Sequence, residues 1–275
     1  MKITAQEVNE LRKTTGAGMM DCKQALMESD GDIEKAIDYL RKKGQKIAAK
    51  RADRDASEGV VLAKVSQDKT FAAVVMVNCE TDFVAKNQDF ISYVESIIDL
   101  AVANKLSSAD ALKAAHLNDR TVEESFVDKT GIIGEKIQLG KYEAVSAESV
   151  YAYVHPGNRI ASIAGLNKAG ENFEEAGHDV VMQIAAMSPV AIDKDSVPQD
   201  MIDREIEIGK EQARQEGKPE DMLEKIALGK LNKFFKESTL LNQSFIKDSK
   251  KSVDQYLKEF DKGLTVNNFK RVALA

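Results

Sequence analysis

Aromatic side chains and long apolar runs are scarce in this sequence. It has no tryptophan, and its six tyrosines and ten phenylalanines make up 6% of the 275 residues. With so few rings, the chain offers little surface on which the bases of a single-stranded nucleic acid could stack. No apolar run approaches the roughly 20 residues that span a bilayer, and the first residues, Met1 to Thr4, do not begin a signal peptide. We therefore expect a cytoplasmic protein with no membrane partner.

Cysteine and histidine are also rare. Cys22 and Cys79 lie far apart, each in an apolar setting, which predicts reduced, packed thiols and neither a disulfide framework nor a metal site. The three histidines, His116, His155 and His178, fall in different segments without metal-ligand spacing, and no Ser-His-Asp or Cys-His grouping can be assembled. The sequence therefore predicts no enzyme and no cofactor.

The charge balance is acidic, with 45 acidic and 39 basic residues and a formal net charge of -6. This balance disfavours extensive nonspecific binding to nucleic acid, so we expect no direct nucleic-acid partner. One basic run, Arg41 to Arg51, is an exception. It is interpreted either as an RNA or ribosome contact or as a solvated linker helix, and the second is favoured because charge runs usually form solvated faces.

The N-terminal segment predicts three short helices. Thr4 and Glu7 form a capping box before a first helix that ends near Lys13, and the glycines after it break the pattern. Further helices are predicted from Met20 to Glu28 and from Ile33 through Leu40. The glycines at 16 and 18 do not form a phosphate loop, since no strand precedes them and no Gly-Lys-Ser/Thr follows. Met19 and Met20 are either core residues or an adaptable contact surface.

The next segment predicts a β-hairpin, residues 60–65 and 71–77, followed by a polar turn over residues 78–87 and a helix that resumes at Phe90. Asp82 and Phe83 lie at the tip of that turn. Either Asp or Thr caps a helix with Phe83 tucked beneath it, or the side chains are offered to a partner. From the residues alone, the capping interpretation is favoured.

A similar order follows in the second half: a strand at residues 141–145, a hairpin of residues 149–154 and 160–166, and a helix at 180–186. We interpret the core as a weak internal repeat of two similar α+β subdomains with antiparallel sheets. Residues 199–237 predict an antiparallel coiled-coil hairpin, because their apolar stripe is narrow and its flanks are charged. Val266 to Leu274 is expected to return as a closing strand.

Two motifs carry a family resemblance. The segments Leu11 to Leu26 and Cys79 to Ala85 resemble two signatures of the bacterial translation elongation factor Ts family, and they occur in the same order along the chain. Members of this family are the nucleotide-exchange factors for the GTPase elongation factor Tu. Residues 240–259 resemble the family's C-terminal module. Asp254 stands there in place of the usual Gly, which puts the local helix cap in doubt.

The resemblance implies an α+β protein in four parts. These are a ubiquitin-associated-like docking bundle with linker helix (1–54), a first core subdomain (55–145), a second core subdomain with the C-terminal module (146–198 and 238–275), and the coiled-coil hairpin (199–237). It also implies elongation factor Tu as the partner, and GDP release from that partner without bond chemistry. The role of the hairpin has three alternatives: self-association, binding of another partner, and plain protrusion. Self-association would give a dimer of the heterodimer.

The resemblance further implies partner-binding residues. Asp82 and Phe83 would enter the GTPase near its magnesium site, with Phe83 as a wedge between helices and Asp82 disturbing the shell of the ion. Further contacts are implied at Arg12, Met19, Met20, Ile133, His155, Ile246 and Lys247. From the residues alone, His155 is a loop residue that is either merely solvated or a contact. Two rival functions remain, an adaptor that uses the N-terminal bundle alone and a nucleotide-binding enzyme.

Overall fold

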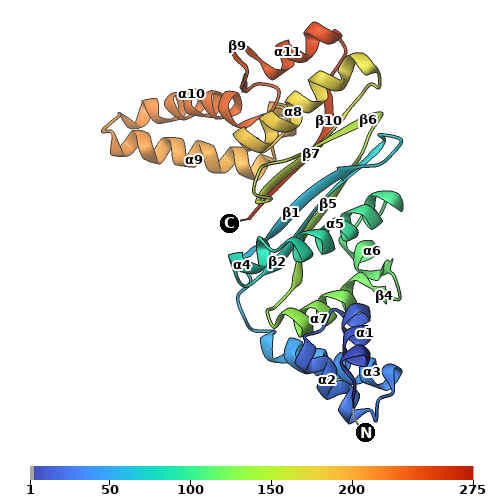
Figure 1. Ribbon diagram of the computed structural model, residues 1–275. Helices are drawn as coiled ribbons and strands as arrows, with labels where there is room; N and C mark the ends of the chain where they lie inside the picture. Colours follow the sequence, from blue (N-terminus) through green and yellow to red (C-terminus); the bar gives the residue numbers. More distant parts are fainter. Residues whose placement is uncertain (1–2, 275) are drawn as a thin grey trace. The chain divides into compact units, whose positions relative to one another are not determined.

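Helices and antiparallel sheets alternate along the chain, as expected for an α+β protein (Figure 1). The computed structural model describes residues 3–274. They form two units: the first contains the described parts of Met1–Leu62, Val75–Tyr142 and Ala273–Ala275, and the second contains Ala63–Val74 and Glu143–Val272. Each unit is described below by itself.

The first unit begins with the three predicted helices, α1 (Ala5–Thr15), α2 (Met19–Glu28) and α3 (Ile33–Arg51). The capping box of Thr4 and Glu7 is present, and Gly16 ends α1 with φ 70°, a left-handed conformation that glycine adopts without strain. The helices share a core of small and aliphatic side chains, namely Val8, Leu11, Ala17, Cys22, Ala25, Leu26 and Ala36.

Helix α3 differs from the prediction in its length. The basic run does not form a separate linker helix, because α3 continues through it to Arg51. Its only helix-weakening residue, Gly44, is buried at a crossing with α7 (Val122–Ile133). A Cβ on Gly131 of α7 would overlap the Cα of Gly44, so the two backbones approach more closely than a side chain at position 131 would allow. The second half of α3 is therefore packed against the first unit's α7.

Helix α5 (Gln88–Ala103) also packs against α7. The Tyr93 hydroxyl lies 2.6 Å from the Ser125 Oγ, and the Tyr93 ring meets the Phe126 ring edge-on at 6.3 Å between centroids. Helix α6 (Ala109–Ala114) and the antiparallel pair β3 (His116–Leu117) and β4 (Arg120–Thr121) connect α5 to α7.

The predicted first hairpin is present, and its strands are longer than predicted. Strands β1 (Glu58–Val65) and β2 (Phe71–Cys79) form a three-stranded sheet with β5 (Gln138–Ser146), in the order β1-β2-β5. The boundary between the two units falls within these strands. Strand β2 runs two residues beyond the apolar run, to Cys79, so it leads directly into the turn that carries Asp82.

The second unit contains the predicted second hairpin. Strands β6 (Ser149–Val154) and β7 (Ile160–Leu166) pair antiparallel, with Ser149 opposite Leu166, and β10 (Val266–Ala273) closes the sheet in the order β10-β7-β6, as predicted. A short turn of helix (Glu171–Phe173) leads into α8 (Glu174–Met187), which lies along β6 and β7 (Figure 1). Their buried side chains form a single core.

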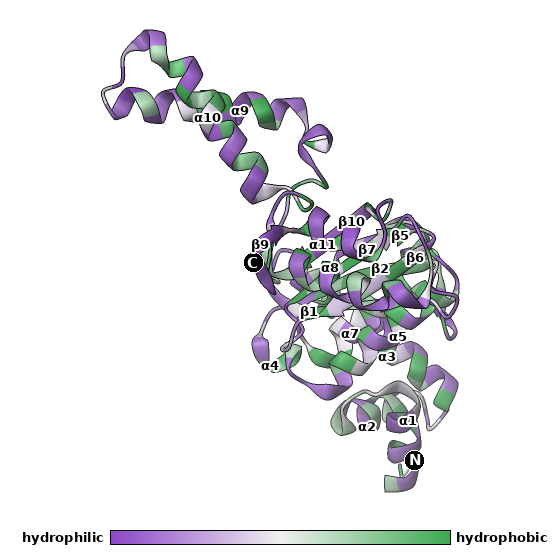
Figure 2. Cartoon of the chain, turned by 90° about the horizontal axis from the view of Figure 1, so that it is seen from above, coloured by the Kyte–Doolittle hydropathy of each residue, from purple (hydrophilic) through white to green (hydrophobic). Residues whose placement is uncertain are grey.

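The predicted helical hairpin consists of α9 (Gln199–Gln215) and α10 (Glu220–Ser238), which follow a short 3-10 turn at Lys194–Ser196. Ion pairs join Arg214 to Glu220 at 2.9 Å and Lys210 to Glu224 at 3.8 Å, so residue numbers rise in one helix as they fall in the other and the helices are antiparallel. Figure 2 shows the hairpin as mostly hydrophilic with scattered hydrophobic residues. Within residues 3–274, no helix has the length and apolar character needed to cross a membrane.

The last segment of the second unit contains the short strands β8 (Ser244–Phe245) and β9 (Asp248–Ser252) and helix α11 (Val253–Phe260). The doubt raised by Asp254 is resolved, because Ser252 and Gln255 form a complete capping box at the start of α11. Asp254 accepts a hydrogen bond from the Lys258 ammonium at 2.6 Å, one turn further along the helix.

Candidate functional site

The turn after β2 forms a one-turn helix, α4 (Asp82–Ala85), with none of its residues buried. Thr81 is its N-cap, and the Thr81 hydroxyl accepts a hydrogen bond from the Val84 amide at 3.5 Å. The capping half of the prediction is therefore confirmed. The other half is wrong: Phe83 is not tucked beneath the helix, because its residue surface is 83% exposed.

A second phenylalanine shows how unusual this exposure is. Phe173 occupies the corresponding place in the second half of the chain, between the β6–β7 hairpin and α8, and it is only 5% exposed within the second unit's core. Burying a phenylalanine side chain contributes roughly 1.5 to 3 kcal/mol. Phe83 forgoes this stabilisation in the free chain, which is typical of a residue that is buried by a partner.

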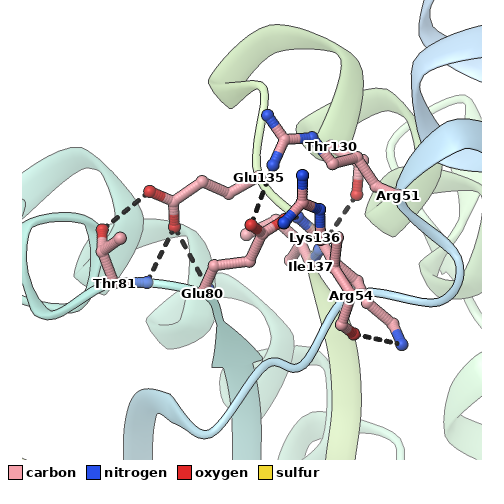
Figure 3. Close-up of polar contacts among 8 residues, drawn as sticks. All are labelled: Arg51, Arg54, Glu80, Thr81, Thr130, Glu135, Lys136 and Ile137. Carbon is pink, nitrogen blue, oxygen red and sulfur yellow. Dashed lines mark hydrogen bonds and ion pairs between the residues drawn. The ribbon is translucent and has the colours of Figure 1, made fainter.

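The residues before α4 are held by the carboxylate of Glu135, which follows α7 (Figure 3). Its Oε2 accepts hydrogen bonds from the backbone amides of Glu80 at 3.1 Å and Thr81 at 3.0 Å. Its Oε1 accepts a hydrogen bond from the Thr81 hydroxyl at 2.7 Å. A charged acceptor makes such bonds stronger than neutral ones. One side chain therefore fixes two consecutive residues of the turn.

The side chain of Glu80 makes the reciprocal contacts. Its Oε1 accepts a hydrogen bond from the Lys136 amide at 2.7 Å, and its Oε2 accepts one from the Arg51 guanidinium at 2.8 Å (Figure 3). The Lys136 ammonium donates to the carbonyls of Ala52 at 2.7 Å and Arg54 at 3.0 Å. The turn is thereby joined to the end of α3 and to the segment between α7 and β5.

Asp82 is partly exposed and carries its charge at the first position of α4. The Lys86 ammonium donates a hydrogen bond to its Oδ2 at 2.6 Å, and this bond lowers the pKa of Asp82. Aspartates are ordinarily ionised at neutral pH, and the lowered pKa keeps the Asp82 carboxylate ionised to lower pH than usual. The tip of the turn thus presents a carboxylate and a benzyl ring side by side in sequence.

Cys79 and Cys22 are both buried and free, which confirms the prediction of packed, reduced thiols. Burial, and after it the negative charges of Glu135 and Glu58, raise the pKa of Cys79 to about 12. Burial also raises the pKa of Cys22.

We expect a chromogenic disulfide reagent at pH 8 to react with neither cysteine in the folded chain, because thiolate is the reactive form and both pKa values are raised. In denaturant both thiols should react within the mixing time. Raising the pH from 8 to 9 should leave the folded protein unreactive. Fast labelling of Cys79 in the native state would contradict the burial on which this expectation rests.

The other candidate residues of the first unit are exposed or half-buried. Arg12 lies on the exposed face of α1, and Met19 and Met20 begin α2 with 56% and 72% exposure, so their interpretation as core residues is wrong. Ile133 is the half-buried last residue of α7, two residues before Glu135. Met27 is also exposed on α2 and was missed, because nothing in its local sequence separates it from a core methionine.

The candidate residues of the second unit lie in two turns. His155 is exposed between β6 and β7, with its Nδ1 3.0 Å from the Tyr153 hydroxyl. Ile246 and Lys247 form the exposed turn between β8 and β9. The Lys247 ammonium pairs at 2.6 Å with the buried carboxylate of Asp179, so this turn is fixed to α8.

Within the described residues, 3–274, no group of three or more His, Cys, Asp or Glu side chains is arranged to hold a metal ion. Hydrogen bonds join the turn that carries Asp82 and Phe83 to the segment that follows Ile133: the Glu135 carboxylate accepts from the Glu80 amide, and the Glu80 carboxylate accepts from the Lys136 amide. Surface-exposed apolar and charged residues of this kind suit the binding of another macromolecule.

Comparison with known proteins gives the family. The family model described as Elongation factor TS matches residues 80–275. Over 273 residues the chain is 53% identical to the Elongation factor Ts of Christiangramia forsetii, covering 99% of each chain. It is 54% identical over 275 residues to that of Cytophaga hutchinsonii, again covering 99% of each, and 49% identical over 276 residues to that of Porphyromonas gingivalis, covering 100% of this chain and 99% of the relative. This chain therefore belongs to the elongation factor Ts family and is a translation elongation factor.

Proposed function

We propose that this protein is a guanine-nucleotide exchange factor that promotes GDP release from translation elongation factor Tu, by inserting Asp82 and Phe83 near the magnesium and nucleotide site of that GTPase. The observation that carries the proposal is the 83% exposure of Phe83 on a turn held by the side chains of Glu80 and Glu135. Membership of the elongation factor Ts family supports the choice of partner. The exchange makes and breaks no covalent bond and needs no cofactor of this chain's own.

The energetic basis is reciprocal linkage. A factor that binds the nucleotide-free GTPase more tightly than the GDP-bound form must weaken GDP binding by the same ratio. Burying one phenylalanine contributes roughly 1.5 to 3 kcal/mol, which corresponds to only about a tenfold to hundredfold change in an equilibrium. Further contacts must therefore contribute, and we assign them to Arg12, Met19, Met20, Ile133, His155, Ile246 and Lys247.

The carboxylate of Asp82 has a different task from the ring of Phe83. A carboxylate brought beside the partner's Mg²⁺ site would disturb the water and side-chain shell of the ion, and loss of those ligands would weaken the hold of the metal and of GDP. The carboxylate is ionised at neutral pH, as aspartates ordinarily are, and the Lys86 ammonium lowers its pKa further. The ion pair between Asp82 and Lys86 lies at the surface, so Asp82 can exchange it for a contact with the partner at little cost in free energy.

We also propose the finer architecture that this function uses. The helices of residues 1–54 act as a ubiquitin-associated-like docking bundle, residues 55–145 and the segments 146–198 and 238–275 act as two similar core subdomains, and residues 199–237 act as a coiled-coil hairpin. The ion pairs Arg214–Glu220 and Lys210–Glu224, and the close approach of Gly209 to Ala227, support antiparallel packing of the two helices. Its role stays open between self-association, binding of another partner and plain protrusion.

The proposal is tested by loading the cognate elongation factor Tu with a fluorescent GDP analogue and adding the full chain with excess unlabelled GDP. We expect release to accelerate with factor concentration until it saturates, because the factor acts on a bound complex. An unchanged release rate at saturating concentrations would contradict the function. Equilibrium dialysis of the chain alone with GDP and ATP separates the rival interpretation, since a nucleotide-binding enzyme would retain one of them.

The adaptor interpretation needs a more careful test than deletion of residues 1–54. That deletion would remove Arg51, whose guanidinium binds Glu80, and half of the α3–α7 crossing, so it would disturb the turn as well as the bundle. Met19→Ala with Met20→Ala changes only exposed side chains. If docking is their task, this variant should need a higher concentration for half-maximal exchange and reach the same maximal rate.

A further inference from the structure

We propose that Glu135 is a positioning residue for nucleotide exchange: its carboxylate sets the place of the turn from which Asp82 and Phe83 project. The inference rests on the proposed function and adds to it a residue that touches neither the nucleotide nor the GTPase in the proposed mechanism. Its basis is the set of contacts in Figure 3.

The turn is held mainly by polar contacts. None of the residues of α4 is buried, and Val84 and Ala85 are only half-buried. Beside the bonds to Glu135, the Glu80 side chain binds Lys136 and Arg51, and the Cys79 thiol donates to the Thr81 carbonyl at 3.2 Å. The polar groups immediately before it are the amides of Glu80 and Thr81 and the Thr81 hydroxyl, and all three donate to the one carboxylate of Glu135. The place of Phe83 therefore depends on a side chain that comes from a segment 55 residues further along the chain.

Glu135 is itself held in place. It follows Gly134, which ends α7 with φ 81° in the left-handed region, and the next amide, that of Lys136, donates to Glu80 at 2.7 Å. Glu135 thus binds the amides of Glu80 and Thr81, and Glu80 binds the amide that follows Glu135. Such reciprocal bonding fixes the turn before any partner arrives, and a preorganised contact does not have to be ordered on binding.

The test replaces Glu135 in the full chain and measures release of the fluorescent GDP analogue from elongation factor Tu. In Glu135→Ala the turn loses three charge-assisted hydrogen bonds, so Phe83 is no longer held where the GTPase needs it. We expect the maximal release rate at saturating factor to fall about tenfold, since small misplacements of a positioned group have effects of this order or larger. The concentration for half-maximal release should change little, because the other docking residues are intact.

Glu135→Gln is the conservative rescue. Both amides donate to the same carboxylate oxygen, Oε2, while the Thr81 hydroxyl donates to the other, Oε1. A glutamine can place its carbonyl oxygen where Oε2 lies and donate from its amide nitrogen to the Thr81 hydroxyl, which can reverse its role. The maximal rate should therefore return to within about threefold of the original protein, given the loss of charge assistance.

The matched control is Glu124→Ala. Glu124 belongs to the same helix, α7, and its carboxylate also accepts a backbone hydrogen bond, from Thr121 at 3.0 Å, but it makes no contact with the turn. This variant loses a capping box and should keep the original maximal rate. An equal fall in Glu124→Ala and Glu135→Ala would show a merely structural effect and overturn the inference.

A double-mutant cycle separates positioning from general weakening. If Glu135 acts through Phe83, adding Glu135→Ala to Phe83→Ala should slow release no further, whereas independent effects would multiply. If Glu135→Ala fails to fold, as judged by circular dichroism, Thr81→Val keeps Glu135 and both of its amide bonds. It removes the hydroxyl's bond to Glu135 together with its weak cap bond from the Val84 amide, and should give a smaller fall, about threefold.

The two failures are distinguishable. If Phe83→Ala slows release and neither Glu135→Ala nor Thr81→Val does, the positioning role is wrong and the proposed function stands. If Phe83→Ala itself releases GDP at the original rate, the proposed insertion of Phe83 is wrong, and the positioning inference falls with it.

Discussion

A chain that carries Asp82→Ala and Phe83→Ala is expected to fold, to dock on elongation factor Tu and to release GDP slowly. Phe83 is 83% exposed and Asp82 is only partly covered, so the free energy of unfolding should change by less than about 0.5 kcal/mol. The ring loses its burial in the complex, worth roughly 1.5 to 3 kcal/mol. The maximal release rate should therefore fall about tenfold to a hundredfold, with a further fall from the missing carboxylate.

Release of the fluorescent GDP analogue gives the rate, and binding of the variant to nucleotide-free elongation factor Tu gives the affinity. Ile208→Ala is a suitable control, because it also truncates an exposed apolar side chain, on α9, to which we assign no role in exchange. Asp82→Asn with Phe83 intact separates the charge from the ring. Release at the original rate in the double variant would refute the assignment of these two residues.

Elements with local signals were predictable from the sequence. The capping box of Thr4 and Glu7, the glycine that ends the first helix and the second hairpin each depend on neighbouring residues, and each is present. The family motifs are local as well, which is why Asp82 and Phe83 could be singled out from them. The extent of α3 was missed because the basic run was separated from the helix, although no residue between Ile33 and Arg51 ends it.

The exposure of Phe83 could not be predicted from pattern alone. Phe83 and Phe173 follow hairpins in similar contexts, yet one is exposed and the other is buried. The difference arises from tertiary packing: Phe173 has a core of α8 and the β10-β7-β6 sheet beside it, whereas α4 has no buried residue. The favoured interpretation, in which Phe83 is tucked beneath the helix, is wrong for this reason.

The contacts of Glu135 were also beyond the sequence. Residues 80 and 135 are 55 positions apart, and each is an unremarkable glutamate in its own segment. Arg51 ends α3 and Lys136 follows α7, two helices that pack together, and both bind Glu80 of the turn after β2. A site that depends on such long-range contacts needs the fold before it can be recognised, even where its exposed residues belong to a local motif.

The packing of α3 against α7 can be tested by substituting each of the two glycines, Gly131 and Gly44, at which the helices cross. Gly131→Ala should lower the free energy of unfolding by about 1 to 3 kcal/mol, the usual effect of overpacking. The reason is that its Cβ would overlap the Gly44 Cα, a backbone atom that can move only with the whole of α3. Urea unfolding followed by circular dichroism gives the difference.

Gly44→Ala is the matched control, since it adds the same methyl group at the same crossing. Its Cβ would lie 3.6 Å from the Gly131 Cα and 3.8 Å from the Val127 carbonyl oxygen, which is ordinary van der Waals contact. Alanine also favours helix over glycine by about 1 kcal/mol, so this variant should be as stable as the original or more so. Equal destabilisation by both substitutions would contradict the arrangement in which a Cβ at position 131 overlaps the facing backbone and a Cβ at position 44 does not. Because α3 ends at Arg51, which binds Glu80, displacement of α3 in Gly131→Ala should also slow GDP release, and Gly44→Ala should leave release unchanged.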